Sequence, residues 1–297
     1  MLTWLVPAML KKIPSLIVRR PVAEHWRMAI RAARTPIFDS GGQPDMEGFR
    51  WIESPKGRFH ADPFLLDVQG KMYLFFEDLD YAANRGRISC CSVTGETLGP
   101  VIPVLERPYH LSYPHVFWDN GRLFMIPESR ENGTVDLYSC VEFPGKWQLD
   151  RCLFEGHAVD TTLWVEGGVY WFFTTLQEPR GGATQLWLFW ADSLTGEWNS
   201  HPENPISTDV RNARGAGAMF RRNGHLYRPS QNCGPHYGYS FQLNKVVTLT
   251  KESYQEVPGE QVPPTWSDRM VATHTYSLAE GLEVIDGCCR FPSADVV

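Results

Sequence analysis

The sequence predicts an all-β fold, a five-bladed β-propeller, and the prediction rests on a repeated hairpin, its period and the composition. A strand, a tight turn and a second strand occur together five times, first from Phe59 to Glu77 around a turn at Asp67–Gly70. Aligned on the turns, one repeat position is occupied in order by Asp62, Tyr113, Asp160, Ala216 and Thr273. The spacings are 51, 47, 56 and 57 residues. A period of about 50 residues with several strands per unit is typical of a propeller.

The four later hairpins turn at residues that tolerate the positive φ of a tight loop. They span residues 112–128, 160–174, 215–231 and 273–286, with Asn-Gly, Gly-Gly or Glu-Gly at the turns. Outer strands are expected at residues 87–93, 135–141, 185–191 and 239–249. The 11 Trp and 16 Phe residues suit sheets that pack face to face around an axis.

The N-terminal region predicts two different elements. Residues 1–20 are expected to form a short helix or a frayed extension, because about 10 apolar residues cannot cross a bilayer core of ~30 Å. A helix lying on a membrane surface is the alternative, since Lys11 and Lys12 follow the apolar run. Residues 25–31 alternate as a strand does, and the last repeat is short of strands. This strand is expected to close the ring, which makes residues 21–297 a single propeller domain.

Composition excludes several classes of protein. The chain has 297 residues, 43% of them hydrophobic, so disorder is not expected. A net charge of −6 argues against nucleic acid as the main partner, and no integral membrane span is expected. The seven cysteines form no C-x-x-C pattern and read as buried hydrophobes of a reducing compartment, which favours a cytoplasmic location. The sequence leaves the oligomeric state open.

The repeat alignment predicts which side chains meet at the propeller axis, because the first strand of every blade lines the central shaft. Asp62, Tyr113, Asp160 and Thr273 share one repeat position. A second ring is expected from the ends of the second strands. Its members are Glu77, Glu128 and Gln231, with Arg228 beside them. The neighbours expected on the wall of the same pocket are His60, His115, Arg214 and His274. The pocket is expected to bind a small molecule or a glycan.

These residue types allow three interpretations. A pair of carboxylates across the axis could act as general base and general acid, with Glu128 the acid candidate. Alternatively, Asp62 and Asp160 tie neighbouring blades together through backbone N–H groups. A third interpretation is a divalent metal held by His60, His115 and His274 with Asp62 or Glu128, although no local ligand spacing supports it.

Several short motifs resemble known families. Ala61-Asp62-Pro63-Phe64, Tyr113-Pro114 and Asp160 resemble the five-bladed propeller of glycoside hydrolase family 43. Other stretches resemble the N-terminal domain of glucosamine inositolphosphorylceramide transferases, and that likeness runs from about His25 to Gly287. They are Met125–Ser129, Tyr227–Cys233, Tyr237-Gly238, His274-Thr275 and Val284–Gly287.

The resemblance to family 43 implies roles for individual residues. Asp62 matches the general base and Asp160 the aspartate that modulates the acid. The expected acid is missing, because the fourth inner strand reads Arg214-Gly215-Ala216-Gly217. Glu128 or Glu77 would have to serve instead. The sequence therefore predicts an enzyme acting at a glycosidic carbon by inverting hydrolysis or a related transfer. The alternatives are a glycan-binding propeller without catalysis, or acid–base chemistry on another small metabolite.

Overall fold

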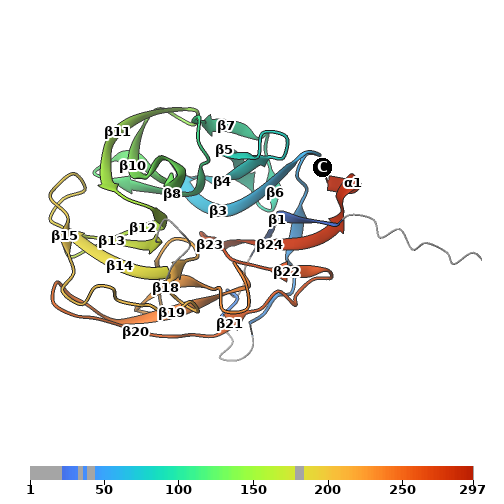
Figure 1. Cartoon of the computed structure of the whole chain (residues 1–297). Helices are drawn as coiled ribbons and strands as arrows, with labels where there is room; N and C mark the ends of the chain where they lie inside the picture. Colours follow the sequence, from blue (N-terminus) through green and yellow to red (C-terminus); the bar gives the residue numbers. More distant parts are fainter. Residues whose placement is uncertain (1–21, 33–35, 39–43, 178–183, 297) are drawn as a thin grey trace, which may run out of the picture.

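The computed structural model describes residues 22–32, 36–38, 44–177 and 184–296. Five antiparallel sheets surround a central axis, as Figure 1 shows in a view close to that axis. The predicted fold class, a five-bladed all-β propeller, is confirmed. The short helix expected in residues 1–20 lies outside the described residues.

Each blade is built outward from an inner strand. Blade 1 holds β3 (Arg58–Val68), β4 (Lys71–Asp80), β5 (Arg85–Thr94), β6 (Thr97–Leu98) and β7 (Ile102–Leu105). Blade 2 holds β8 (Ser112–Asp119), β9 (Arg122–Glu128), β10 (Thr134–Glu142) and β11 (Lys146–Glu155). Blade 3 holds β12 (Ala158–Glu166), β13 (Val169–Gln177), β14 (Thr184–Ala191) and β15 (Asn199–Ser200).

Blades 4 and 5 have split inner strands. Blade 4 holds β16 (Arg214–Gly215), β17 (Phe220–Arg222), β18 (His225–Asn232), β19 (Ser240–Leu249), β20 (Tyr254–Val257) and β21 (Gln261–Val262). Blade 5 holds β22 (Met270–Ala272), β23 (Tyr276–Ala279), β24 (Leu282–Pro292), β1 (Val22–Ala32) and β2 (Arg50–Ile52). The described helices are two single turns, η1 (Arg130–Asn132) and α1 (Ser293–Val296). In the described part of the chain, no helix is long and apolar enough to cross a membrane.

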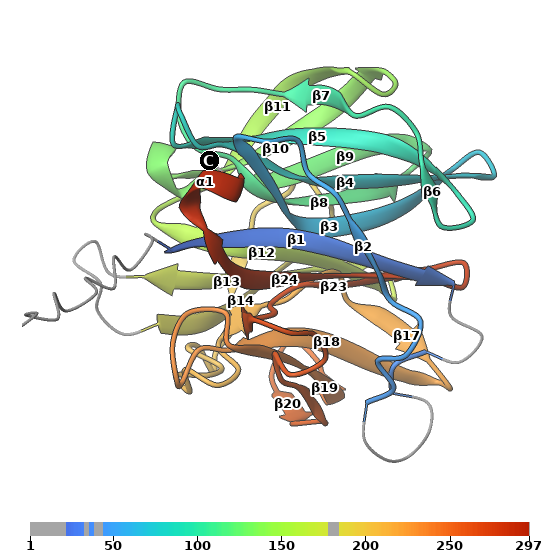
Figure 2. The same ribbon diagram turned by 90° about the vertical axis from the view of Figure 1, so that its right-hand side faces the viewer.

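The ring is closed by pairing the two ends of the described chain, as predicted. Strand β1 lies antiparallel to β24 along its whole length, from Val22 opposite Pro292 to Ala32 opposite Leu282. Strand β2 then adds the outer edge of the blade. Figure 2 shows β1 and β24 side by side, with α1 near the start of β1. The last repeat lacks outer strands in sequence because the N-terminal strands supply them.

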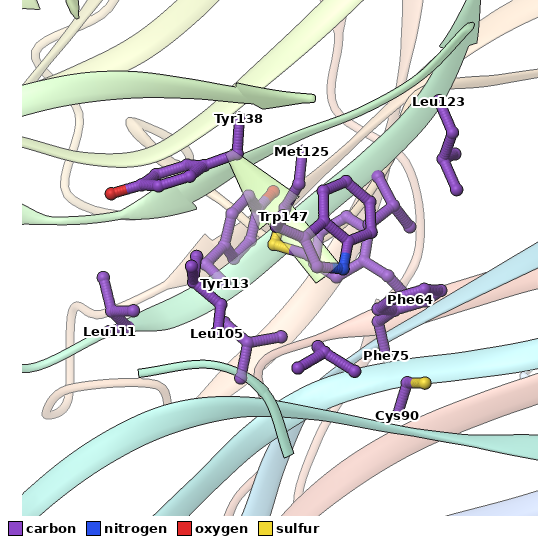
Figure 3. Packing of buried hydrophobic residues seen from close by; sticks show 13 residues of the cluster. Phe64, Phe75, Cys90, Leu105, Leu111, Tyr113, Leu123, Met125, Tyr138 and Trp147 are labelled. Carbon is purple, nitrogen blue, oxygen red and sulfur yellow. The ribbon is translucent and has the colours of Figure 1, made fainter. Parts of the chain in front are cut away.

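Apolar side chains fill the wedges between adjacent blades. Five buried clusters are present, one for each neighbouring pair of blades. Figure 3 shows the cluster between blades 1 and 2, where Phe64 and Phe75 face Met125 and Trp147. The cluster between blades 5 and 1 includes Met28 of the closing strand. Closure therefore buries apolar surface in addition to pairing the sheet edges.

The inner strands of blades 1, 2 and 3 share a bulge. The pairing register shifts between Ala61 and Phe64, between Ser112 and His115, and between Val159 and Thr162. Within the bulges, Asp62, Tyr113 and Asp160 have left-handed φ values of 52°, 42° and 51°. A bulge with a left-handed residue re-aims a side chain. These are three of the five residues that the repeat alignment placed at one position.

Candidate functional site

Asp62 of blade 1 lies beside His274 and Asp286 of blade 5. Asp62 accepts a hydrogen bond from the backbone N–H of Tyr113 at 3.1 Å and one from the Thr275 hydroxyl at 2.8 Å. These bonds tie blade 1 to blades 2 and 5. Burial raises the pKa of Asp62 to about 7; the positive charge of His274 opposes the rise and nearby carboxylates add to it. At neutral pH this group can therefore both hold and release a proton.

His274 is held as a cation by its surroundings. Its Nδ1 lies 2.7 Å from Asp286 Oδ2, and its ring stacks on Trp26 with centroids 3.9 Å apart. Burial alone would lower the pKa of His274, but the carboxylate of Asp286 outweighs it, and the pKa is about 9. The half-exposed ring of Tyr237 packs against the His274 ring in a T-shaped arrangement, with the ring centroids 5.6 Å apart. The site thus has an aromatic wall that includes a residue of the closing strand.

A second group is built around Asp160. The Arg214 Nε donates to Asp160 Oδ2 at 2.5 Å, and the Gln231 amide donates to the same oxygen at 3.2 Å. A terminal nitrogen of Arg214 lies 3.9 Å from Glu128 Oε2, and the Glu128 side chain is 13% exposed. Burial and then the charge of Asp160 raise the pKa of Glu128 well above its usual value, although Arg214 opposes the rise. The Glu128 carboxyl therefore holds its proton more tightly than an exposed glutamate does.

The inner strand of blade 4 lies very close to neighbouring blades at its two glycines. A Cβ at Gly215 would lie 2.8 Å from the Asp160 carbonyl oxygen and 2.9 Å from the Tyr113 hydroxyl. A Cβ at Gly217 would lie 2.1 Å from the Tyr276 carbonyl oxygen. Neither position has room for a side chain. Arg214, the first residue of this stretch, sends a positive charge to Asp160 where the family 43 pattern has an acid.

Glu77 is paired with a histidine that sequence reasoning missed. His110 Nε2 lies 3.2 Å from Glu77 Oε1, and His110 Nδ1 accepts the backbone N–H of Gly86 at 3.1 Å. The His110 side chain is 33% exposed. This pair lies close enough to Asp62 for the charge of Glu77 to act on its pKa. We call Asp62, Glu77, Glu128, Asp160, Arg214, Gln231 and His274 the axial cluster.

Three other predicted site residues have contacts within the blade sheets. His60 Nε2 is 3.5 Å from Asp78 Oδ1 within the sheet of blade 1. His115 packs between the rings of Phe64 and Phe117. Arg228 forms a buried ion pair with Glu256 at 2.6 Å on blade 4. These three side chains contact the blade sheets, and none of their recorded contacts joins them to the axial cluster.

Tyr113 is fully buried, and its hydroxyl is occupied by structural contacts. It bonds to Thr162 Oγ1 at 2.9 Å, donates to the Gly217 carbonyl at 3.1 Å and accepts the Gly217 N–H at 2.8 Å. The hydroxyl thereby connects blades 2, 3 and 4. Tyr113 therefore links the inner strands that carry the axial cluster.

One group of described residues could hold a cation. The ligand atoms of Asp62, His274 and Asp286 all lie within 4.8 Å of one another. Of the histidines considered from the sequence, only His274 belongs to this group. The hydrogen bond between His274 Nδ1 and Asp286 fills part of that space, so a cation there would replace the histidine proton.

Asp286, His110 and Trp26 are cluster contacts that sequence reasoning did not assign. Asp286 accepts the backbone N–H groups of His274 and Thr275, both at 2.9 Å. Its signal in the sequence is an acidic residue inside the apolar run Val284-Ile285-Asp286-Gly287. A buried charge in a strand requires partners. His110 and Trp26 carry no comparable signal.

A family model for the N-terminal region of glucosamine inositolphosphorylceramide transferase 1 matches residues 52–270. The chain belongs to this family. It is 33% identical over 259 residues to the Arabidopsis thaliana transferase, covering 84% of this chain and 32% of the relative. A rice relative (Oryza sativa subsp. japonica) is 34% identical over 209 residues, covering 67% of this chain and 28% of the relative. The chain thus spans about a third of the length of the curated relatives it matches.

Solved glycoside hydrolases share the fold. The α-L-arabinofuranosidase PaAbf62A of Podospora anserina, solved with cellotriose, has a TM-score of 0.58 at 9% identity, covering 91% of this chain and 98% of that one. Zg3597, a family 117 glycoside hydrolase of Zobellia galactanivorans, has a TM-score of 0.56 at 13% identity, covering 90% of each chain. A family 43 β-1,3-galactosidase, BT3683, has a TM-score of 0.51 at 13% identity, covering 71% of this chain and 82% of that one. At these identities the likeness is one of fold.

Proposed function

We propose that the axial cluster binds a sugar or glycoconjugate and acts at its glycosidic carbon by acid–base chemistry. Asp62 is the general base and takes the proton of the attacking water or acceptor hydroxyl. Glu128 is the general acid and protonates the oxygen that leaves the glycosidic carbon. Each proton taken up by Asp62 is balanced by one that Glu128 releases, as inverting reactions require.

The observation that supports this proposal is the contrast between two buried carboxyl groups at one axis. Burial and then the charge of Asp160 raise the pKa of Glu128 well above its usual value, and Asp160 is itself bound by Arg214 and Gln231. The pKa of Asp62, about 7, allows it to accept a proton near neutral pH. Carboxyl groups whose environments give them different proton affinities are a common basis for assigning acid and base.

Side chains in and beside the axial cluster are suited to hold a sugar. Tyr237 offers a half-exposed ring, and sugar rings present C–H faces to aromatic planes. Arg214 lies 4.7 Å from the centroid of the Tyr237 ring and fixes its orientation. The Arg214 side chain is 14% exposed and that of His110, the partner of Glu77, is 33% exposed, so both can donate hydrogen bonds to sugar hydroxyls.

The second candidate is a glycan-binding propeller without turnover. It is favoured by the ion pair between Arg214 and Asp160, because family 43 places an acid on that strand. In this case the carboxylates accept hydrogen bonds from sugar hydroxyls and no proton is transferred.

The test is a screen of sugar glycosides and nucleotide sugars against wild type, Asp62→Asn and Glu128→Gln. The matched control is Asp67→Asn, at an exposed position near the end of β3. The proposal predicts turnover in wild type and in the control, with a fall of about 10²–10⁴-fold in each cluster variant at nearly unchanged ligand affinity. Saturable binding without turnover in wild type would establish the second candidate. Turnover that survives both cluster substitutions would refute the assignment of base and acid.

A further inference from the structure

A second cavity lies away from the axis, where the two ends of the described chain meet. It has a volume of about 500 Å³ and opens between the start of β1, the segment after β2, the start of β22 and α1. We call it the closure pocket and define it by Arg27, Ser54, Lys56, Arg269, Phe291 and Asp295. Figure 2 shows α1 beside the start of β1 at this edge.

The pocket carries a surplus of positive charge. Three cationic side chains line it, Arg27, Lys56 and Arg269, against two carboxylates, Glu53 and Asp295. Glu53 is already bound by Arg27. Lys56 and Arg269 form no recorded ion pair with the described residues. The Lys56 ammonium and the Arg269 guanidinium can therefore both donate hydrogen bonds to an anion in this cavity.

Arg27 is held in place by aromatic rings. Its guanidinium carbon lies 4.8 Å from the ring centroid of Trp51 and 5.8 Å from that of Phe291. A cation fixed in this way loses less side-chain entropy on binding a ligand.

Ser54 adds a buried hydroxyl that has no hydrogen-bond partner among the described residues. Arg269 has a left-handed φ of 63°, a conformation that side chains larger than glycine adopt at some cost.

We propose that the closure pocket binds a phosphate group through Lys56, Arg269 and Arg27, with Ser54 as a further donor. Phosphate fits these groups because guanidinium and ammonium heads donate to its oxygens from several directions, and a hydroxyl supplies a neutral donor. The shared chemistry is an exposed phosphate, which a soluble ion or an anionic lipid headgroup can present. The site is separate from the axial cluster and does not depend on glycan chemistry there.

Binding of inorganic phosphate, measured by calorimetry at low salt, tests the proposal. The double variant Lys56→Gln/Arg269→Gln is expected to weaken binding by about five- to tenfold, since each exposed charge contribution is modest. Lys146→Gln/Arg122→Gln removes the same charge from blade 2 and should leave binding unchanged. Asp295→Asn should strengthen binding, because it removes the unpaired carboxylate of the pocket.

Vesicles distinguish the two sources of phosphate. Wild type and both double variants are compared on phosphatidylcholine vesicles with and without about one-fifth phosphatidic acid. Capture by the acidic vesicles alone, lost in the Lys56/Arg269 variant and kept in the blade 2 variant, supports the pocket with a lipid phosphate as its ligand. The proposal is overturned if neither probe binds wild type. It is also overturned if both double variants weaken binding equally, since that outcome reflects net charge.

Discussion

Asp62→Asn should change the stability of the protein in a way that depends on pH. The folded protein holds the Asp62 proton up to a pKa of about 7, and an unfolded aspartate releases it near the ordinary aspartate pKa of 3.8. A carboxyl whose pKa rises on folding stabilises the protonated folded state, so wild type loses stability as pH rises from about 4 to 7. Asparagine cannot ionise and does not lose stability by this route.

The size of the effect follows from the two pKa values. Linkage gives a wild-type loss of about 3 kcal/mol in the free energy of unfolding between pH 5 and pH 8, relative to the variant. The new amide also disturbs the bonds to Tyr113 and Thr275, at a cost of about 1–3 kcal/mol. That cost is the same at both pH values and cancels in the comparison. Asp286 remains in the variant to keep His274 protonated.

Urea denaturation of wild type, Asp62→Asn and Asp67→Asn at pH 5 and pH 8 measures the effect. From pH 5 to pH 8, the free energy of unfolding of Asp62→Asn should rise by about 3 kcal/mol relative to that of wild type. The difference in unfolding free energy between Asp67→Asn and wild type should stay constant, because the Asp67 side chain is exposed near the end of β3. A constant difference for Asp62→Asn would refute the argument that burial keeps this group protonated.

Three further predictions concern the acid–base pair, the buried Tyr113 hydroxyl and the strand that closes the ring. The pH–rate profile of wild type should rise near pH 7 as Asp62 loses its proton, and Glu128→Gln should lower kcat at every pH; an unchanged kcat would exclude Glu128 as the acid. Tyr113→Phe should lower the free energy of unfolding by about 1–3 kcal/mol, because the buried Gly217 N–H loses its acceptor; a change within error in urea denaturation would contradict this. Met28→Ala should cost about 2–5 kcal/mol, since this fully buried side chain of the closing strand leaves a cavity; loss confined to local fraying by hydrogen exchange would contradict cooperative closure.

The repeats predicted most of the fold because tight hairpins restrict their turn residues so strongly. The expected outer strand at residues 87–93 is observed as β5, Arg85–Thr94, and the closing strand at 25–31 as β1, Val22–Ala32. The inner strand of blade 4 was harder to predict. It is split into β16 and β17, because Gly215 and Gly217 lie against neighbouring backbones. Glycine supplies no side-chain periodicity from which such a split could be predicted.

The bulges explain which site residues could be predicted. Asp62, Tyr113 and Asp160 lie within bulges, whose presence the turn alignment does not reveal. A bulge inserts one residue and exchanges the two faces of the strand beyond it. His60 lies two residues from Asp62, and His115 lies two residues from Tyr113. A regular strand would place each histidine on the same face as that neighbour. The bulge accounts for their position among the blade rings instead.

Arg214 brings the opposing observations at this site together. Its positive charge stabilises Asp160, and the charge of Asp160 then helps Glu128 to keep its proton. The same positive charge opposes the protonation of Glu128 directly, from 3.9 Å. The net direction is a raised pKa, because burial and Asp160 outweigh the guanidinium. An arginine on the fourth inner strand is therefore compatible with a proton donor at this axis, provided that the donor comes from blade 2. Blade 4 has no room for a side chain at Gly215 or Gly217. Because Glu128 of blade 2 has a raised pKa beside Asp160, the missing family 43 acid does not by itself imply a loss of acid–base chemistry.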